Sequence, residues 1–167
     1  MPAQADRLFV AVWPPPDVVE QLAALPRLDN PGVRWVLPAS WHVTLRFIGT
    51  AVADAVMAGL DAVRLPSATA QLGPQVEHLG RDAVVVPVDG LAELAAAVVA
   101  ATSDVGRPPD GRPFNGHLTL ARLRRTRSGL VGCSVDGSFR VTEVVLVRST
   151  LTDAGAVYDH IARWPTF

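Results

Sequence analysis

The chain has 167 residues, of which 49% are hydrophobic, and its formal net charge at pH 7 is −1. This length and apolar content suffice for one domain with a buried core, and the charge gives no general electrostatic attraction to nucleic acid. All 15 basic residues are arginine. The lack of lysine excludes a P-loop lysine, Schiff-base catalysis and a lysyl-nucleotide intermediate, and therefore an ATP-dependent ligase of the lysyl-adenylate type.

The sequence also predicts the compartment. Its apolar runs are shorter than the roughly 18 residues that a membrane span needs, and the richest, residues 91–101, contains Glu93. Met1 to Asp6 has no basic region followed by an apolar run. The single cysteine, Cys133, cannot form an intramolecular disulfide or a cysteine-rich metal site. We therefore expect a cytoplasmic protein without membrane contact.

The first half of the chain alternates strand and helix patterns. Residues 7–13 predict a strand, which is ended by the prolines at 14–16. Val18, Leu22 and Leu25 then lie on one face of a predicted helix. The next predicted elements are a short strand over 33–36, a strand over 41–48 stopped by Gly49, and a helix over about 52–63.

The second half contains more strand. Residues 68–78 and 82–88, joined around Gly80, predict a β-hairpin. In the helix that follows, Asp89 is placed as the N-cap and Gly106 as the end. A loop over 106–116 then leads to predicted strands over 117–123, 138–150 and 156–164. This order of elements predicts an α+β fold, and we expect one domain over residues 1–167.

One short phrase occurs twice: His-Val-Thr-Leu at 42–45 and His-Leu-Thr-Leu at 117–120. Alternate side chains of a strand point the same way, so His42 and Thr44 share one face, as do His117 and Thr119. Two imidazoles and two hydroxyls provide two proton-transfer groups and two donors to a charged oxygen group. A single His-x-Thr is more often structural, but the pair favours phosphoester chemistry. We predict His42 and His117 as catalytic residues, with Thr44 and Thr119 as substrate contacts.

We predict no metal in this site, because a catalytic zinc ion needs about three protein ligands and neither phrase has another ligand at suitable spacing. The other two histidines, His78 and His160, have no threonine two residues later. We interpret both as polar groups at the surface or at the edge of the core.

Further substrate contacts are predicted from strand parity. Arg46 has the parity of His42, so it could reach the same cleft. Arg122 has the opposite parity to His117 in a regular strand, which would place it on the far face or beyond the strand end. We nevertheless predict Arg122, like Arg46, as a substrate contact that assists the two threonines at the phosphate. Phe114, in a loop rich in Gly and Pro, is the preferred residue for stacking on a base. The aromatic residues at strand positions, which more often belong to a core, are Phe9, Trp35 and Phe47.

The paired motifs resemble those of the two-histidine phosphoesterase superfamily, specifically the RNA 2′,3′-cyclic phosphodiesterases once called 2′-5′ RNA ligases. The likeness covers nearly the whole chain, including residues 7–11, 35–49, 114–122 and 141–149, with Tyr158 and Trp164. The chain departs from the family at Gly116, where proline is common, and at Thr50, where an acidic residue is common. Neither departure touches the His or Thr positions.

The resemblance implies a bilobal α+β fold, with two pseudo-symmetric lobes whose antiparallel sheets line a central cleft and whose helices lie outside. It implies hydrolysis of RNA ends or nucleotides with a 2′,3′-cyclic phosphate to 2′-phosphomonoesters, without metal or cofactor. By the same resemblance His42 donates a proton to the leaving 3′ oxygen and His117 activates water, although pseudo-symmetry leaves these roles exchangeable. We expect a monomer.

Other functions of the same residues remain open. The acid–base pair could act on 2′-5′-linked oligonucleotides or small cyclic nucleotides, or run in reverse as an ATP-independent ligase. From a different class, the chain could be a non-catalytic RNA-binding module. The intact His and Thr of both phrases and the lack of a basic surplus argue against that module.

Overall fold

The structure, a computed structural model, describes residues 2–27, 30–126 and 129–167. Its helices are α1 (Pro16–Ala23), α2 (Ala53–Asp61) and α3 (Ala92–Ala101), with a 3-10 turn, η1 (Pro38–Ser40). Its strands are β1 (Ala5–Val12), β2 (Val33–Trp35), β3 (Val43–Val52), β4 (Ala68–Leu72), β5 (Glu77–Leu79), β6 (Ala83–Asp89), β7 (His117–Leu123), β8 (Gly137–Val141), β9 (Glu143–Thr152) and β10 (Gly155–Pro165). None of the helices in the described ranges is long and apolar enough to cross a membrane.

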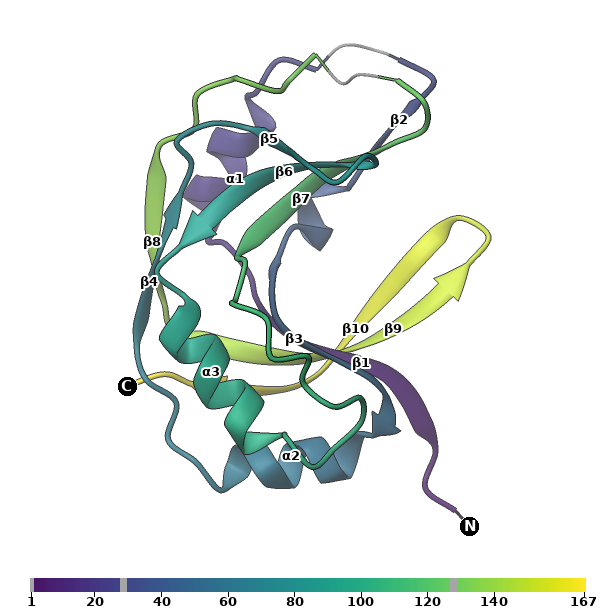
Figure 1. Cartoon of the computed structure of the whole chain (residues 1–167), viewed down its shortest axis with the longest axis vertical. Coiled ribbons are helices and arrows are strands. Elements are labelled where there is room, and N and C mark those ends of the chain that lie inside the picture. The colour runs from purple at the N-terminus through teal and green to yellow at the C-terminus, as the bar shows by residue number, and fades with distance from the viewer. Residues whose placement is uncertain (1, 28–29, 127–128) are drawn as a thin grey trace.

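The strands follow the order β10-β9-β1-β3-β7-β6-β4-β8, with β2 beside β7 and β5 beside β6. Neighbouring strands run antiparallel. This mostly antiparallel, curled sheet with helices packed against it confirms the predicted α+β class (Figure 1).

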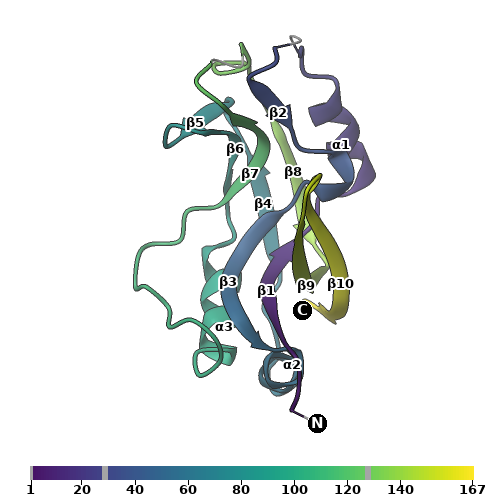
Figure 2. The ribbon, with the colours of Figure 1, turned by 90° about the vertical axis from the view of Figure 1, so that its right-hand side faces the viewer.

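The two motif strands form the joint of the sheet. On one side of the joint lie β3, β1, β9 and β10, and on the other lie β7, β6, β4 and β8. The register between β3 and β7 contains a single pair, Val43 with Leu118. Figure 2 shows the curl of the sheet, and in Figure 1 the β9–β10 hairpin projects away from the rest of the sheet. The sequence therefore brings the two repeated phrases together at the centre of the molecule.

The helices cover the main core. The α1 helix buries Val18 and Leu22 and packs on β8, whereas α2 and α3 pack on each other and on β3, at the other end of the molecule (Figure 1). A second, smaller apolar cluster lies on the opposite face of β1 and β9. It consists of Phe9, Ala11, Val145 and Val147, with Trp13 and Tyr158 packed against it.

Two predicted strands and one predicted stop are corrected by the structure. The β3 strand continues past Gly49, because this residue, with φ of +80°, lies beside a bulge that skips Ile48. The predicted strand over 68–78 is divided into β4 and β5 by a segment that contains Pro74, which has no backbone N–H to pair. The predicted strand over 138–150 is divided into β8 and β9 at Thr142.

The predicted cap of α3 is also wrong. Asp89 is the last residue of β6, and the N-cap position belongs to Leu91, which makes no side-chain capping hydrogen bond. The reason is the turn at Gly90, whose φ of +89° redirects the chain between the strand and the helix.

Candidate active site

The antiparallel pairing of the motif strands arranges the two phrases about a pseudo-two-fold axis. Val43 pairs with Leu118. Extending this register by one residue in each direction places His42 opposite Thr119, and Thr44 opposite His117. In a regular antiparallel pair, the diagonal residues on one face lie about 7–8 Å apart, which leaves room for a phosphate group between the two histidines.

The two imidazoles are oriented in the same way. His42 Nδ1 donates to the carbonyl oxygen of Ser40 over 2.7 Å, and His117 Nδ1 donates to that of Asn115 over 2.9 Å. Because a carbonyl oxygen only accepts, Nδ1 carries a proton in both rings, and Nε2 is the atom left for proton transfer. Each motif thus fixes the tautomer of its histidine through the residue two positions earlier.

All four motif side chains line one cavity of about 420 Å³, a volume typical of small-molecule sites. The motif strands provide its floor, and β1, β2, β9 and β10 contribute further walls. The other lining residues are Arg7, Phe9, Arg34, Trp35, Val36, Leu37, Ser40, Phe47, Arg122, Ser149, Ala154, Ala156 and Tyr158. The predicted quartet of His42, Thr44, His117 and Thr119 is therefore brought together in space.

His42 is the more enclosed of the two histidines. Its ring is stacked on Phe9 and on Trp13, with centroids 5.0 Å apart in both cases, and the edge of Tyr158 approaches it at 5.3 Å. Burial lowers the pKa of His42, and the nearby His117 and His160 lower it further, while the hydrogen bond to Ser40 acts in the opposite direction. The neutral imidazole is therefore favoured in the free protein.

Arg46 does not reach the cavity, contrary to the parity prediction. The pairing of β1 with β3 skips Leu45, so a β-bulge turns Arg46 to the core side of the sheet. There Arg46 is 5% exposed, and its guanidinium donates to the carbonyl oxygens of Thr102, Val105 and Arg107. Arg46 holds the end of α3 and the loop that follows it.

Arg122 is turned the other way by an equivalent bulge. The pairing of β6 with β7 skips Leu120, and Arg122 is thereby moved to the face of His117, where it lines the cavity. Phe47 lies five positions after His42, as Arg122 lies five positions after His117. The Leu45 bulge moves Phe47 to the face of His42, and Phe47 also lines the cavity. The repeat therefore extends to corresponding bulges in the two strands.

Phe114 packs against the main core and is not a lining residue of the cavity. The aromatic side chains that do line it are Phe9, Trp35, Phe47 and Tyr158. The sequence contains an indication of this position for Phe9. Residues 8–13 are apolar on both faces of the strand, which predicts that side chains pack against each face.

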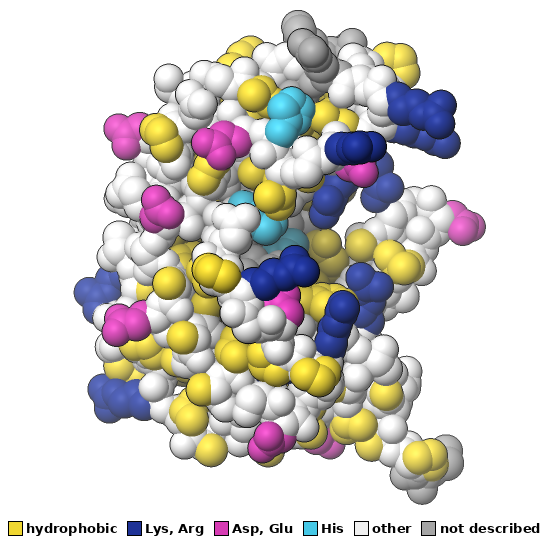
Figure 3. All heavy atoms as spheres, viewed as in Figure 1, with side chains coloured by type: hydrophobic (Ala, Val, Ile, Leu, Met, Phe, Trp, Pro, Cys, Tyr) yellow, Lys and Arg dark blue, Asp and Glu magenta, His cyan; other side chains and the backbone are white. Residues whose placement is uncertain are grey.

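Positive charge surrounds the cavity. Arg7, Arg34 and Arg122 line it, and within the described residues none of the three forms an ion pair with a carboxylate. Figure 3 shows Arg side chains, in dark blue, around the hollow in which histidines are visible. Arg34 and Arg122 are direct partners in the β2–β7 pairing. The chain thus concentrates free positive charge here despite a net charge of −1.

The residue before the second motif has a structural reason to be glycine. A Cβ at Gly116 would overlap the carbonyl oxygen of Val88 and lie 3.1 Å from the Phe114 ring.

In the part of the chain that the structure describes, no group of three or more His, Cys, Asp or Glu side chains could hold a metal ion.

Comparison with known proteins identifies the class. A family model described as LigT-like phosphoesterase matches residues 85–158, which include the second motif. E. coli LigT, in a crystal structure with 3′-AMP, is 26% identical over 98% of this chain and 99% of its own, with a TM-score of 0.78. A structure described as a phosphoesterase is 25% identical over the same shares, with a TM-score of 0.77. A comparison with curated proteins found no significant match.

The fold and the two His-x-Thr motifs define a two-histidine phosphoesterase. Within that superfamily, the chain is similar to the LigT-like phosphoesterases, in sequence over residues 85–158 and in fold over nearly its whole length. A protein from Thermus thermophilus, 24% identical over 95% of this chain and 97% of its own, with a TM-score of 0.76, shares the fold.

Proposed function

We propose that this phosphoesterase hydrolyses the 2′,3′-cyclic phosphate at RNA ends to a 2′-phosphomonoester. The main support is the symmetric quartet of two histidines and two threonines on one cavity. The E. coli relative was crystallised with 3′-AMP and with ATP. A 3′-phosphorylated ribonucleotide carries its phosphate beside the 2′ oxygen, as the proposed substrate does, and this supports a ribonucleotide site here.

The proposed reaction needs one base and one acid. His117 Nε2 takes a proton from water, and the water oxygen attacks phosphorus. The bond from phosphorus to the 3′ oxygen breaks, and His42 Nε2 gives its proton to that oxygen, so that a 2′-phosphate and a free 3′ hydroxyl remain. Thr44 and Thr119 donate hydrogen bonds to the nonbridging oxygens as negative charge accumulates on them.

His42 must gain its proton before it can act as the acid. Burial lowers the pKa of His42 in the free protein, but an anionic phosphate beside the ring favours the imidazolium. Substrate binding would therefore charge the acid at the site where it is needed. The basic limb of the bell-shaped pH profile, which the acid His42 sets, should therefore lie at higher pH for kcat than for kcat/KM.

The free arginines support an RNA substrate. Arg34 and Arg122 can bind the phosphate that precedes the terminal nucleotide, because a guanidinium presents paired N–H donors to phosphate oxygens. Phe47, 40% exposed beside Arg7, offers a face on which a base can stack.

The test is turnover of a nucleoside 2′,3′-cyclic monophosphate and of a dinucleotide ending in a cyclic phosphate, both with EDTA present. Chromatography would separate the 2′- and 3′-phosphate products. We expect only the 2′-phosphate, and a loss of about 10²- to 10⁴-fold in rate for His42→Ala or His117→Ala. His78→Ala is the matched control, because His78 is exposed on β5, outside the cavity.

A loss below tenfold in both site variants would refute the mechanism. Without turnover, binding of a 2′-phosphorylated ribonucleotide to the wild type and to the double His variant distinguishes the alternatives. Equal binding indicates an RNA-binding module, whereas binding that depends on the histidines indicates a different cyclic or 2′-5′-linked substrate.

A further inference from the structure

The enclosure of His42 by aromatic rings has no counterpart at His117. Phe9 and Trp13 both stack on the His42 ring, with interplanar angles of 29° and 26°. Tyr158 meets it edge-on at 88°. Among the ring contacts of the described residues, none involves His117. The pseudo-symmetry of the motifs is therefore broken at one histidine.

Trp13 itself makes two further contacts, one hydrogen bond and one ring contact. Its indole Nε1 donates to the carbonyl oxygen of Ala39 over 3.0 Å, in the 3-10 turn that leads into His42. The ring of His160, on β10, lies against the indole with a centroid distance of 4.5 Å. Trp13 does not line the substrate cavity. Trp13 therefore contacts the imidazole from outside the residues that line the cavity.

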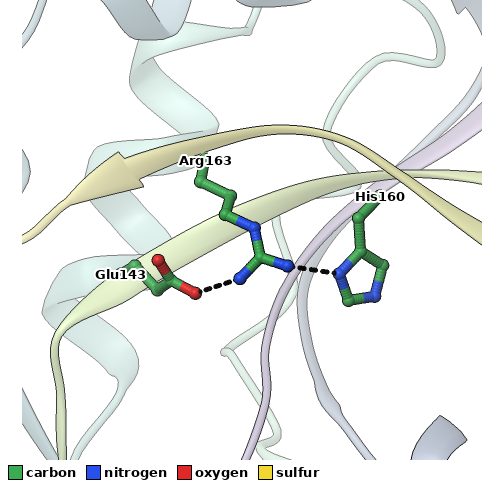
Figure 4. Close-up of polar contacts among 3 residues, drawn as sticks. All are labelled: Glu143, His160 and Arg163. Carbon is green, nitrogen blue, oxygen red and sulfur yellow. Dashed lines mark hydrogen bonds and ion pairs between the residues drawn. The ribbon is translucent and has the colours of Figure 1, made fainter.

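His160 is anchored in turn by an ion pair. Arg163 donates through Nη2 to His160 Nδ1 over 3.2 Å and through Nη1 to Glu143 Oε1 over 2.5 Å (Figure 4). Because arginine has only donors, His160 Nδ1 is the acceptor and carries no proton. Burial and the charge of Arg163 lower the pKa of His160, and Glu143 and Asp159 oppose them. The lowered pKa favours the neutral form of His160 in the free protein, and this form leaves Nδ1 free to accept from Arg163.

We propose that Trp13 is a positioning residue for His42, and that His160, bonded to Arg163, packs against the Trp13 indole and helps to hold it in place. The inference rests on the proposed function only in the role that it gives to His42. Stacked rings fix the plane of the imidazole and so the direction of Nε2. The face of an indole also attracts a cation, so this packing stabilises the imidazolium against the cost of its burial.

Two substitutions distinguish the effect of an aromatic face at position 13 from the effect of a side chain that only fills the space. Trp13→Leu removes the face, whereas Trp13→Phe keeps a face and loses the donor to Ala39. An NMR titration of the His42 ring, without substrate, reads the effect directly. We expect the pKa of His42 to fall by about half a unit in Trp13→Leu, from the loss of one cation–π contact, and to stay close to wild type in Trp13→Phe. The pKa of His42 is also sensitive to His117 and His160, so both rings are followed in the same spectra.

Kinetics give the second readout. Because Trp13 lies outside the cavity, Trp13→Leu should lower kcat about tenfold and leave KM within about twofold, as expected when a catalytic group is misoriented. His160→Gln tests the contact between His160 and the Trp13 indole, and it leaves Trp13 itself in place if Trp13→Leu fails to fold. We expect a smaller loss of kcat in this variant, about threefold, at unchanged KM. Trp164→Phe, on β10 but bonded to Asp61, is the control for loss of an indole elsewhere.

A rise in the pKa of His42 in Trp13→Leu, which simple loss of burial would give, would overturn the proposal. So would wild-type kcat in both Trp13→Leu and His160→Gln. If the wild type turned over no cyclic phosphate, the proposed function would fail, but the titration would still test the contact between Trp13 and His42.

Discussion

Replacing Arg46 by methionine should weaken the fold without changing the chemistry of the site. The Arg46 side chain lies on the core side of β3, 5% exposed, and donates to Thr102 through both the carbonyl and the hydroxyl oxygen. It also donates to the carbonyl oxygens of Val105 over 3.1 Å and of Arg107 over 2.8 Å. Methionine fills much of the same space but provides no donor.

The expected cost follows from these acceptors. Thr102 is 1% exposed, and its carbonyl oxygen would keep the backbone N–H of Val105 at 3.1 Å but lose the charged donor without access to water, at about 1–3 kcal/mol. Val105 and Arg107 are less buried, and water can replace part of what their carbonyl oxygens lose. We therefore expect the free energy of unfolding to fall by about 3 kcal/mol, which a typical domain with 5–15 kcal/mol can tolerate.

Urea unfolding followed by circular dichroism measures this change, and kinetics on a nucleoside 2′,3′-cyclic phosphate measure the site. The KM of Arg46→Met should stay within about twofold of wild type, since the side chain lies outside the cavity. Arg122→Met is the matched control, because Arg122 is exposed and lines the cavity. It should change stability by less than about 0.5 kcal/mol and lower kcat/KM about tenfold for a dinucleotide that ends in a cyclic phosphate, because this substrate has the preceding phosphate that Arg122 would bind. A stability loss below about 1 kcal/mol in Arg46→Met, or a tenfold rise in its KM, would refute the assignment of Arg46 to the scaffold.

Three further outcomes test other parts of the structure. Because burial, and then neighbouring charge, lowers the pKa of His42, the unfolded chain binds more protons at this group below about pH 6.5, and the free energy of unfolding should fall as the pH is lowered through that value. The fall should be smaller in His42→Gln, and equal pH dependence in the two proteins would contradict the shift. Gly116→Ala should destabilise the protein by about 1–3 kcal/mol, because its Cβ would overlap the Val88 carbonyl oxygen, and an unchanged Tm would show that the entry to β7 adapts freely. Arg34→Ala should raise the KM of a dinucleotide cyclic phosphate more than that of a nucleoside cyclic phosphate, and should lower the slope of log kcat/KM against log salt by about 0.7. Equal effects on both substrates would show that Arg34 does not contact the phosphate that precedes the terminal nucleotide.

Local sequence is sufficient to predict the quartet of the site and the class of the fold. Strand parity places His42 with Thr44 and His117 with Thr119 whatever the rest of the chain does, because these residues precede the irregular positions of β3 and β7. The likeness of the two phrases predicted that both would serve one site, and the structure places all four side chains on one cavity.

What lies beyond the quartet depends on contacts between distant segments. Parity holds only in a regular strand, and the bulges at Leu45 and Leu120 reverse it, so Arg46 enters the core and Arg122 enters the cavity. A bulge depends on the pairing with a neighbouring strand, which the local sequence does not contain. The same is true of Trp13 and His160, which are 147 residues apart in the chain and meet beside His42 only because β10 and β1 lie on either side of β9.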